Sequence, residues 1–444
     1  MLLAVVTVLI LLGTHTKLFS LVAFVICALE MLFDKTKFKL MMLTYLMLLA
    51  HIFKISPTGM SYFTFLMFIY IGKKVIEEKT VLLTVVFFSA YMIGVQIGHS
   101  NVDINEDIKL IGNLLFIGYA LGELRSYSEK DKETLCITYI IAVIVSSFMR
   151  FFDSPFFNIS AYTRPLKSEG YGAGVDRLVR FSGLYQDPNY YTVNLIIALC
   201  LIVILYYKGN TSKLFCVGTA GLILYFGTLT YSKSFLFILL LPLAVFMYAN
   251  HSRGRTDVQV LSVLLLLVAV GLVLVSNPDY VFNMTRRVET KESITTGRAD
   301  IWIGYLDYLY HHPAILLFGK GFAGELVDGA ASHNFYVEAL YYLGIFGWLL
   351  LFIVIANSGL QFRPKRKLNL MNFSVLLTIL ITYFFLSQLR SYELPIHFMF
   401  AFMVLFQWDL GKSGDAPVKA VCSPLVPGLM DGNVKTLLSK VNNK

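Results

Sequence analysis

The chain has 444 residues, of which 57% are hydrophobic and only 15% charged, and its mean hydropathy is +0.68. This composition excludes a water-soluble globular domain of ordinary type. The formal net charge of +9 invites a nucleic-acid partner. Much of the excess positive charge, however, lies in short loops between apolar runs and in five lysines of the C-terminal tail, so we expect no nucleic-acid partner.

Apolar runs long enough to cross a bilayer recur from end to end. Lipid offers no hydrogen bonds to the backbone, so runs of this length predict an all-α polytopic membrane protein with about 12 to 14 transmembrane helices. The run at Met1 to Leu12 lacks a basic n-region and a small-residue cleavage site, which favours a retained first span over a signal peptide. In chain order, the predicted spans are centred near Val6, Val25, Leu46, Phe68, Phe87, Phe116, Val143, Ile197, Leu222, Leu239, Leu266, Leu349, Leu377 and Met403.

Basic residues in short connectors predict the orientation, because cytoplasmic loops are enriched in lysine and arginine. With a cytoplasmic N-terminus, every even-numbered connector is basic, through Lys35, Lys37 and Lys39; Lys73 and Lys74; Arg125 and Lys130; Lys208 and Lys213; Arg253 and Arg255; and Arg363, Lys365, Arg366 and Lys367. The predicted segments are N-terminal transmembrane helices (1–150), a first long outer loop (151–190), central transmembrane helices (191–276), a second long outer loop with an interfacial helix (277–334), C-terminal transmembrane helices (335–410) and a cytoplasmic tail (411–444).

Neither the cysteines nor the histidines predict a metal site. Four of the five cysteines stand in apolar runs and the fifth in the tail, a spacing that offers no disulfide framework and no zinc site. His311 and His312 are adjacent, so on a helix they point in different directions and make a poor chelate. The histidines at positions 15, 51, 99, 251 and 397 have no informative neighbours.

Positive charge is also concentrated in the outer connectors, where the orientation rule does not place it. Clustered arginines on an outer face suit a phosphate-bearing or otherwise anionic substrate. The alternative is that they are solvated loop residues or anchors for lipid headgroups. These residues are Arg164, Arg177, Arg180, Lys233, Arg286, Arg287, Arg298, His333 and Arg390.

The second long loop has a recognisable internal order. The apolar and aromatic stretch Ile301 to Leu309 predicts a helix lying along the membrane surface, with Arg298 in its first turn. Ser332–His333–Asn334 stands immediately before the next span. A histidine at the water interface can keep a pKa near neutrality and can act as a base or an acid.

Four further residues have both a structural and a functional interpretation. Asp187 begins Asp187–Pro188–Asn189, which predicts a turn and helix cap, although the carboxylate can also bind sugar hydroxyls. Glu338 is expected to face the interior of the bundle near His333, because a carboxylate facing lipid is costly. For Gly344 and Gly347 we favour close helix packing.

Several motifs together resemble the O-antigen ligase and O-antigen polymerase superfamily. The resemblance rests on His333–Asn334 followed after nine residues by Gly344–Ile345–Phe346–Gly347, on the segment from Arg180 to Asn189, on Ser232–Lys233–Ser234, and on Gly297–Arg298 with Trp302 four residues later. These segments are in the family's order across the C-terminal two-thirds of the chain. The chain is most similar to a Wzy-type polysaccharide polymerase.

The resemblance implies a GT-C-like fold in a bacterial inner membrane, with an active site facing the periplasm and no metal or other cofactor. The substrate it implies is an undecaprenyl-pyrophosphate-linked oligosaccharide, as both donor and acceptor, with membrane lipid and a chain-length regulator as further partners. His333 is the implied general base. Pyrophosphate or glycan contacts are implied for Arg298, Arg180, Lys233, Asp187, Asn334 and Glu338. Lys233 stands where many members have arginine, so it keeps the charge without the bidentate geometry.

Three functions remain open at this point. A polymerase joins lipid-linked repeat units, whereas a ligase moves the finished glycan onto lipid A–core, and the motifs do not separate the two. The segments from Tyr185 to Tyr191 and from Ser232 to Phe235 favour the polymerase. A flippase or small-solute transporter is the alternative from another class, but spans nearly free of charged residues disfavour it.

Overall fold

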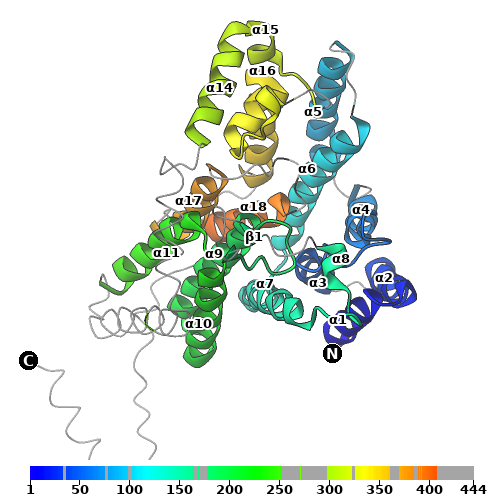
Figure 1. Cartoon of the computed structure of the whole chain (residues 1–444), viewed down its shortest axis with the longest axis vertical. Coiled ribbons are helices and arrows are strands. Elements are labelled where there is room, and N and C mark those ends of the chain that lie inside the picture. Colours follow the sequence, from blue (N-terminus) through cyan, green and yellow to red (C-terminus); the bar gives the residue numbers. More distant parts are fainter. Residues whose placement is uncertain are drawn as a thin grey trace, which may run out of the picture. The chain divides into compact units, whose positions relative to one another are not determined.

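The computed structural model describes most of the chain between Met1 and Gln407 (Figure 1). The described residues are 1–33, 37–75, 79–98, 103–163, 168–169, 178–251, 271, 298–322, 326–360, 370–384, 389, 391 and 393–407. All of them belong to the unit Met1–Leu410. The predicted C-terminal tail lies outside the described residues.

Helices dominate this unit. The N-terminal part contains α1 (Leu2–Gly13), α2 (Lys17–Phe33), α3 (Phe38–Met47), α4 (Tyr62–Val75), α5 (Lys79–Gly98), α6 (Ile104–Leu124), α7 (Glu129–Met149), η1 (Arg150–Phe152) and α8 (Ile159–Tyr162). A short antiparallel pair follows, β1 (Ser168–Glu169) and β2 (Leu178–Val179). The remaining elements are α9 (Pro188–Lys208), α10 (Lys213–Leu229), α11 (Lys233–His251), α14 (Arg298–His311), α15 (Pro313–Phe318), η2 (Val327–Gly329), α16 (Phe335–Leu360), α17 (Leu370–Phe384), α18 (Leu394–Phe402) and the π-helical turn η3 (Met403–Gln407).

The predicted all-α polytopic membrane class is confirmed. Among the described residues, three helices have the length and apolar composition needed to cross a bilayer, namely Glu129–Phe152, Pro188–Lys208 and Phe335–Asn357, and shorter apolar helices accompany them. Each predicted span centre lies in a helix or helical turn except Leu266, which is outside the described residues. The number of spans stays a prediction.

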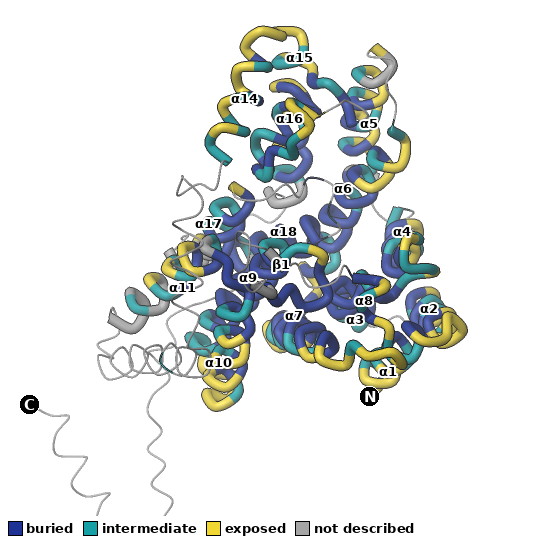
Figure 2. The backbone as a smooth tube through the Cα atoms, in the orientation of Figure 1, coloured by how far each residue is buried: buried dark blue, intermediate teal, exposed yellow. Residues whose placement is uncertain are grey.

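Helix α9 lies at the centre of the bundle. It packs against α7, α10, α11 and α17. In its most apolar stretch 78% is buried, compared with 44% in the corresponding stretch of α16. Figure 2 shows α9 buried along most of its length, whereas α1 and α2 present exposed faces. A helix that is apolar all round is expected in such a central position. Its ends are fixed locally, by Asp187 and Pro188 at the start and by Gly209 in a left-handed conformation after the last turn.

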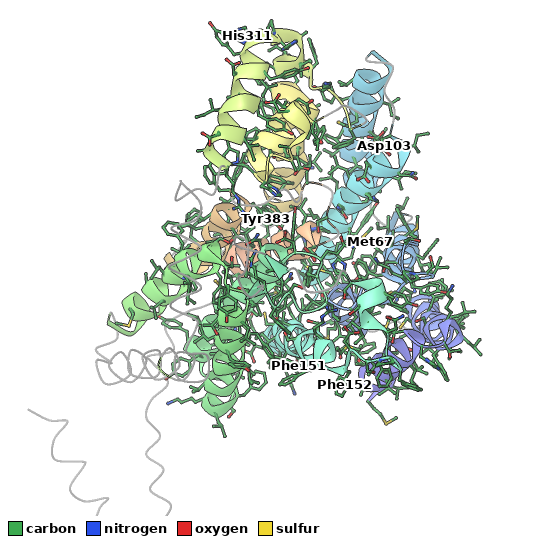
Figure 3. All side chains as sticks on the ribbon, in the orientation of Figure 1. Met67, Asp103, Phe151, Phe152, His311 and Tyr383 are labelled. Atoms are coloured by element: carbon green, nitrogen blue, oxygen red, sulfur yellow. The ribbon has the colours of Figure 1, made fainter. Side chains whose placement is uncertain are left out.

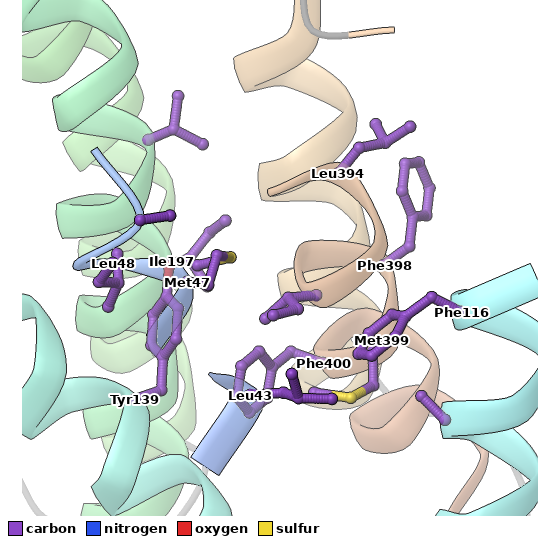
Figure 4. Packing of buried hydrophobic residues seen from close by; sticks show 14 of the residues in the cluster. Leu43, Met47, Leu48, Phe116, Tyr139, Ile197, Leu394, Phe398, Met399 and Phe400 are labelled. Atoms are coloured by element: carbon purple, nitrogen blue, oxygen red, sulfur yellow. The ribbon is translucent and has the colours of Figure 1, made fainter. Parts of the chain in front are cut away.

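The core joins helices that are far apart in the sequence. Tyr139 of α7 contacts Phe400 of α18 edge-on, with ring centroids 4.9 Å apart, and Ile197 of α9 lies in the same core (Figure 4). Within it the Nε2 atom of His397 lies 3.0 Å from Oδ1 of Asn194, and its Nδ1 atom lies 2.8 Å from the Tyr383 hydroxyl. These hydrogen bonds satisfy a buried imidazole, which assigns His397 to the scaffold.

Three lysines of the even-numbered connectors form ion pairs with acidic residues of α6 and α7. Lys37 lies 2.6 Å from Asp131, and Lys74 lies 3.3 Å from Glu123. Lys208, at the end of α9, forms an ion pair with Glu133 at 3.6 Å. Surface ion pairs contribute little stability, but their shared location shows that these connectors gather at one end of the helices. α9 has 21 residues, so this end is separated from the helix start by about 30 Å, the thickness of a bilayer core.

Candidate functional site

A pocket of about 390 Å³ opens at the opposite ends of α6 and α9. Its side chains come from α6, α9, α14, α16 and the connector before α18, namely Glu106, Tyr190, Tyr305, Glu338, Tyr342 and Ser391. The loop between α15 and α16 completes the wall with Leu326, Ala331 and Ser332. The volume lies within the roughly 300–1,000 Å³ of small-molecule sites. Asp103 caps α6 just before Glu106, accepting from its backbone N–H at 3.2 Å (Figure 3).

The helix predicted at Ile301 to Leu309 exists as α14, begins at Arg298, and holds the loop that carries His333. Its position along the membrane surface stays a prediction. The indole Nε1 of Trp302 donates to the carbonyl oxygen of Ser332 at 2.8 Å. One turn further along, the Tyr305 hydroxyl donates to the carbonyl oxygen of Ala330 at 2.8 Å. Burial raises the pKa of the Tyr305 phenol, so the hydroxyl keeps its proton for this bond. Two side chains of one helix thus fix the backbone on the N-terminal side of His333.

His333 itself occupies a backbone conformation that is rare for a residue with a side chain. Its φ is +49°, in the left-handed region. The hydrogen bonds that cap α16 come from the next residue, because Oδ1 of Asn334 accepts from the N–H groups of Tyr336 at 2.9 Å and Val337 at 3.1 Å. Asn334 is therefore the residue that caps α16. His333 directly follows Ser332, a residue of the pocket wall.

Glu338 faces the interior of the bundle, as predicted. Its side chain lines the pocket and the residue is only 7% exposed. The carboxylate oxygen Oε2 lies 3.4 Å from the backbone nitrogen of Leu389, in the connector before α18. Its own N–H donates to the carbonyl of Asn334 at 2.9 Å, so the pocket carboxylate and the His333 turn share the first turn of α16.

The Tyr190 hydroxyl interacts with charged side chains from several separate segments. It interacts electrostatically with the carboxylates of Glu338, Asp187 and Glu393 and with the guanidinium of Arg298. Tyr190 is in the first turn of α9 and lines the pocket. Of the predicted site residues, Glu338 lines the pocket, whereas Arg298 and Asp187 lie close enough to Tyr190 to interact with it electrostatically.

Arg180, Asn189 and Ser232 form a second cluster beside this wall. Arg180 is 2% exposed, its Nε donates to the carbonyl of Thr230 at 2.9 Å, and its Nη2 lies 3.3 Å from Oδ1 of Asn189. Ser232 donates to the same Asn189 oxygen at 3.0 Å. Arg180 therefore joins the start of α9 to the link between α10 and α11. Lys233 begins α11, but its side chain is outside the described part of the structure.

Asp187 adopts the cap that its sequence context predicts. Its Oδ1 accepts from the N–H of Asn189 at 2.8 Å, and Pro188 occupies the first turn of α9. The carboxylate thus stabilises the helix start that carries Tyr190 into the pocket.

The glycines of the motif allow a break and a close approach in α16. Gly344 has φ +66° and ψ 179°, which interrupts the helix. The carbonyls that the break releases are taken up by the preceding loop, because Lys320 N–H donates to Tyr341 at 2.9 Å and Gly321 N–H to Tyr342 at 3.0 Å. A Cβ atom on Gly344 would lie 2.3 Å from the backbone nitrogen of Gly319. Close packing is therefore confirmed for Gly344, and the break is an additional finding.

Behind the pocket lies a buried pair that the sequence did not indicate. Nε2 of His51 lies 4.0 Å from Oε1 of Glu393, and Ser391, a pocket residue, donates to Oε2 of Glu393 at 3.2 Å. Burial raises the pKa of Glu393 to about 7 and lowers the pKa of His51 to about 3. Desolvation is the largest cause of both pKa shifts, and the charge of Lys54 further lowers the pKa of His51, so burial favours the uncharged form of each group.

Some predicted residues cannot be placed. Arg164, Arg177, Arg286, Arg287 and Arg390 lie outside the described residues. Conversely, sequence reasoning missed Glu106, Tyr190, Ser391 and Glu393. The acidic cluster at the start of α6 was the only sequence feature that could have indicated Glu106. That Glu106 and Glu338 line the same pocket depends on how the helices pack.

The comparison with known families is consistent with this arrangement. Residues 218–353 match the sequence profile of the family described as O-antigen ligase, a segment that covers under a third of the chain and includes Lys233, Arg298, His333 and Glu338. No curated protein and no solved structure matches the chain. Over residues 218–353 the chain is thus similar to the O-antigen ligase family.

Proposed function

We propose that this protein is a polysaccharide polymerase that joins undecaprenyl-pyrophosphate-linked oligosaccharide repeat units. The observation that carries the proposal is the placement of His333 in a turn held by Trp302 and Asn334, next to a pocket lined by Glu338 and Tyr190. Arg298 supplies positive charge that acts on Tyr190 of the pocket. A base, a cation and a polar pocket are the groups that glycosyl transfer from a lipid pyrophosphate requires.

In the proposed reaction His333 accepts the proton of an acceptor hydroxyl. The hydroxyl oxygen attacks the anomeric carbon of the donor, and the bond between that carbon and the pyrophosphate oxygen breaks. The pyrophosphate leaves with the bonding electron pair. A neutral imidazole is needed at the start, and general-base assistance of this kind is worth on the order of 100- to 10,000-fold in rate.

Arg298 and Lys233 are proposed to neutralise the leaving pyrophosphate. Arg298 is in the first turn of α14, where backbone N–H groups also favour an anion. Arg180 is proposed to act through Asn189, because its guanidinium is already hydrogen-bonded to Thr230 and Asn189. Asp187 and Glu338 are proposed to accept hydrogen bonds from sugar hydroxyls.

The pocket is proposed to face the periplasm of a bacterial inner membrane. The lysines of the even-numbered connectors pair with acids at the far ends of α6 and α9, and short basic connectors face the cytoplasm. The pocket lies at the other ends of these two helices. A pocket on the periplasmic side suits a reaction on glycans that have already crossed the membrane.

A ligase is the second candidate, because the matching family carries that description. In that reaction the acceptor is lipid A–core in place of a second lipid-linked repeat unit. The chemistry at His333 and Arg298 is the same for both, so only the acceptor distinguishes them.

The test is reconstitution of the purified full-length protein with lipid-linked repeat units, followed by separation of the products by length. The polymerase proposal predicts a ladder with the wild type and its loss in His333→Ala. His311→Ala is the matched control, because His311 lies exposed at the end of α14 and bonds its own helix through Asp307.

Three results would overturn parts of this scheme. Transfer to lipid A–core without a ladder would favour the ligase. Counterflow transport without any elongation would favour a transporter. A wild-type ladder from His333→Ala would remove the assignment of His333 as the base.

A further inference from the structure

A tight turn between α3 and α4 holds a lysine in a fixed place. Lys54 pairs with Ser61 in an isolated antiparallel bridge, and the backbone N–H of Ile55 donates to the carbonyl of Met60 at 3.2 Å. The Ser61 hydroxyl donates to the carbonyl of Phe53 at 2.9 Å. Residues 54–61, called the Lys54 turn below, are therefore held by hydrogen bonds across both of their arms.

The Lys54 turn is close to the buried pair behind the pocket. Burial is the larger cause of the lowered pKa of His51, and the charge of Lys54 is the second. The His51 imidazole lies 4.0 Å from the carboxyl group of Glu393, to which the pocket residue Ser391 donates at 3.2 Å. His51 and Glu393 thus connect Lys54 to the pocket wall.

The ammonium group of Lys54 is half-buried and has no acidic partner. Among the residues that the structure describes, no carboxylate forms an ion pair or a hydrogen bond with it, and burial is what lowers its pKa. By contrast, Lys37, Lys74 and Lys208 of the even-numbered connectors all have carboxylate partners. A partly desolvated charge without a partner is costly, so this position suits an anion that comes from outside the protein.

The side chains near Lys54 favour a lipid over a soluble anion. Ile55 is 43% exposed and Met60 is 53% exposed, and both belong to the Lys54 turn. Phe65, in the first turns of α4, is 38% exposed. In a membrane protein, apolar side chains exposed beside a lysine suit the level where lipid chains meet headgroups. A phosphate is the anionic group of many headgroups, and a lysine ammonium binds it as a point charge.

We propose that Lys54 and the exposed apolar side chains of its turn form a binding site for the phosphate group of a membrane lipid, close to the pocket. A polyprenyl pyrophosphate and an anionic phospholipid both carry this group, and the choice of the former as a probe rests on the proposed function. The site belongs to a part of the chain outside residues 218–353, the segment that matches the family profile.

The test titrates purified full-length protein in a neutral detergent, while native mass spectrometry counts the lipid molecules bound. The probes are two pairs, undecaprenyl pyrophosphate with undecaprenol and phosphatidylglycerol with diacylglycerol, and in each pair only the first carries phosphate. Wild type is expected to bind at least one phosphate-bearing lipid more tightly than its counterpart. Lys54→Met should weaken one such binding event roughly tenfold, because a hydrogen bond between charged groups is lost.

Three controls make the result specific. Lys54→Arg keeps the charge and should keep the binding event. Lys17→Met is the matched control, because Lys17 is exposed at the start of α2, and it should leave binding unchanged. Lys54→Met removes a half-buried charge that has no acidic partner, so its melting temperature should be no lower than that of the wild type.

The two probe pairs identify the source of the phosphate. Weaker binding of undecaprenyl pyrophosphate alone in Lys54→Met would support a site for the substrate lipid, and weaker binding of phosphatidylglycerol alone would support a site for bulk phospholipid. The inference would be overturned if wild type bound each phosphate-bearing lipid no more tightly than its counterpart. Unchanged binding in Lys54→Met, an equal loss in Lys17→Met, or a clear fall in the melting temperature of Lys54→Met would overturn it as well.

The binding assay separates this inference from the proposed function. Arg298→Gln should lose elongation while keeping the binding event that depends on Lys54. If wild type fails to elongate lipid-linked units but shows that event, the polymerase proposal fails and the lipid site stands. If wild type elongates units and Lys54→Met binds every lipid as wild type does, the lipid site fails and the polymerase stands.

Discussion

The indole N–H of Trp302 donates a hydrogen bond of 2.8 Å to the carbonyl oxygen of Ser332, the residue before His333. This bond connects two parts of the motif that are 30 residues apart. It makes α14, which begins with Arg298, part of the support for the His333 turn. The cation and the proposed base are therefore positioned by one helix.

Trp302→Phe should lower turnover without unfolding the protein. The substitution leaves the carbonyl of Ser332 without this donor, at a residue that is 3% exposed, and an unmet buried carbonyl costs about 1–3 kcal/mol. If half of that cost falls on the catalytic geometry, elongation falls roughly two- to tenfold. Elongation rate and detergent melting temperature should be measured together. Trp348→Phe is the control, since Trp348 stacks on Phe352 within α16, and equal losses in both variants would contradict the prediction.

Gly344→Ala should destabilise the fold. The backbone at Gly344 has φ +66° and ψ 179°, a region that essentially only glycine occupies and that costs other residues on the order of 1–3 kcal/mol. The new Cβ would also lie 2.3 Å from the nitrogen of Gly319. We expect a clear fall in melting temperature or loss of folded protein after purification. Gly221→Ala in α10 is the matched control, because a Cβ there meets nothing within 4 Å and alanine favours helix. A normal melting temperature for Gly344→Ala would argue against the break in α16.

Asn334→Ala should lose the cap of α16, at a cost of about 0.5–2 kcal/mol. Asn334→Asp should keep it, since an aspartate oxygen can also accept from Tyr336 and Val337. The measurement is the melting temperature of both variants beside wild type. Equal destabilisation by alanine and aspartate would mean that the side-chain oxygen is not what stabilises the helix start.

The buried pair Glu393 and His51 predicts opposite pH dependences. The pKa of Glu393 is raised from 4.5 to about 7, so folding favours its protonated form, and this stability is lost as pH rises towards 7. The pKa of His51 is lowered from 6.5 to about 3, so folding favours its neutral form, and this stability is lost as pH falls below 6.5. Between pH 4.5 and 6.5 the two contributions oppose each other in the wild type.

Substituting either residue of the pair should reveal how the other residue makes the stability of the protein depend on pH. Relative to wild type, the melting temperature of Glu393→Gln should rise as pH increases from 4.5 to 6.5, and that of His51→Gln should fall. Thermal unfolding in one detergent across this range measures both. Difference curves that run parallel for the two variants would show that the pair is not uncharged in the folded protein.

The sequence by itself determined the class of protein and its local elements. Apolar runs predict membrane helices because backbone groups must be satisfied within each segment, and twelve of the predicted centres lie in α-helices while Met403 begins the turn that follows α18. The sequence also predicted that Asp187 caps the start of α9 and that Arg298 lies in the first turn of α14, because capping and helix-start preferences act over a few residues. The order of the motifs also predicted the resemblance to the O-antigen ligase family, whose profile matches residues 218–353.

Only the tertiary structure decided which residues share the pocket. Glu106 and Glu338 are more than 200 residues apart, and no local pattern connects them. The same holds for His51 and Glu393, which meet because the ends of separate helices pack together. Side-chain burial and pairwise electrostatics depend on that packing, so a buried acid behind the pocket and a carboxylate within it become visible only when the helices are assembled.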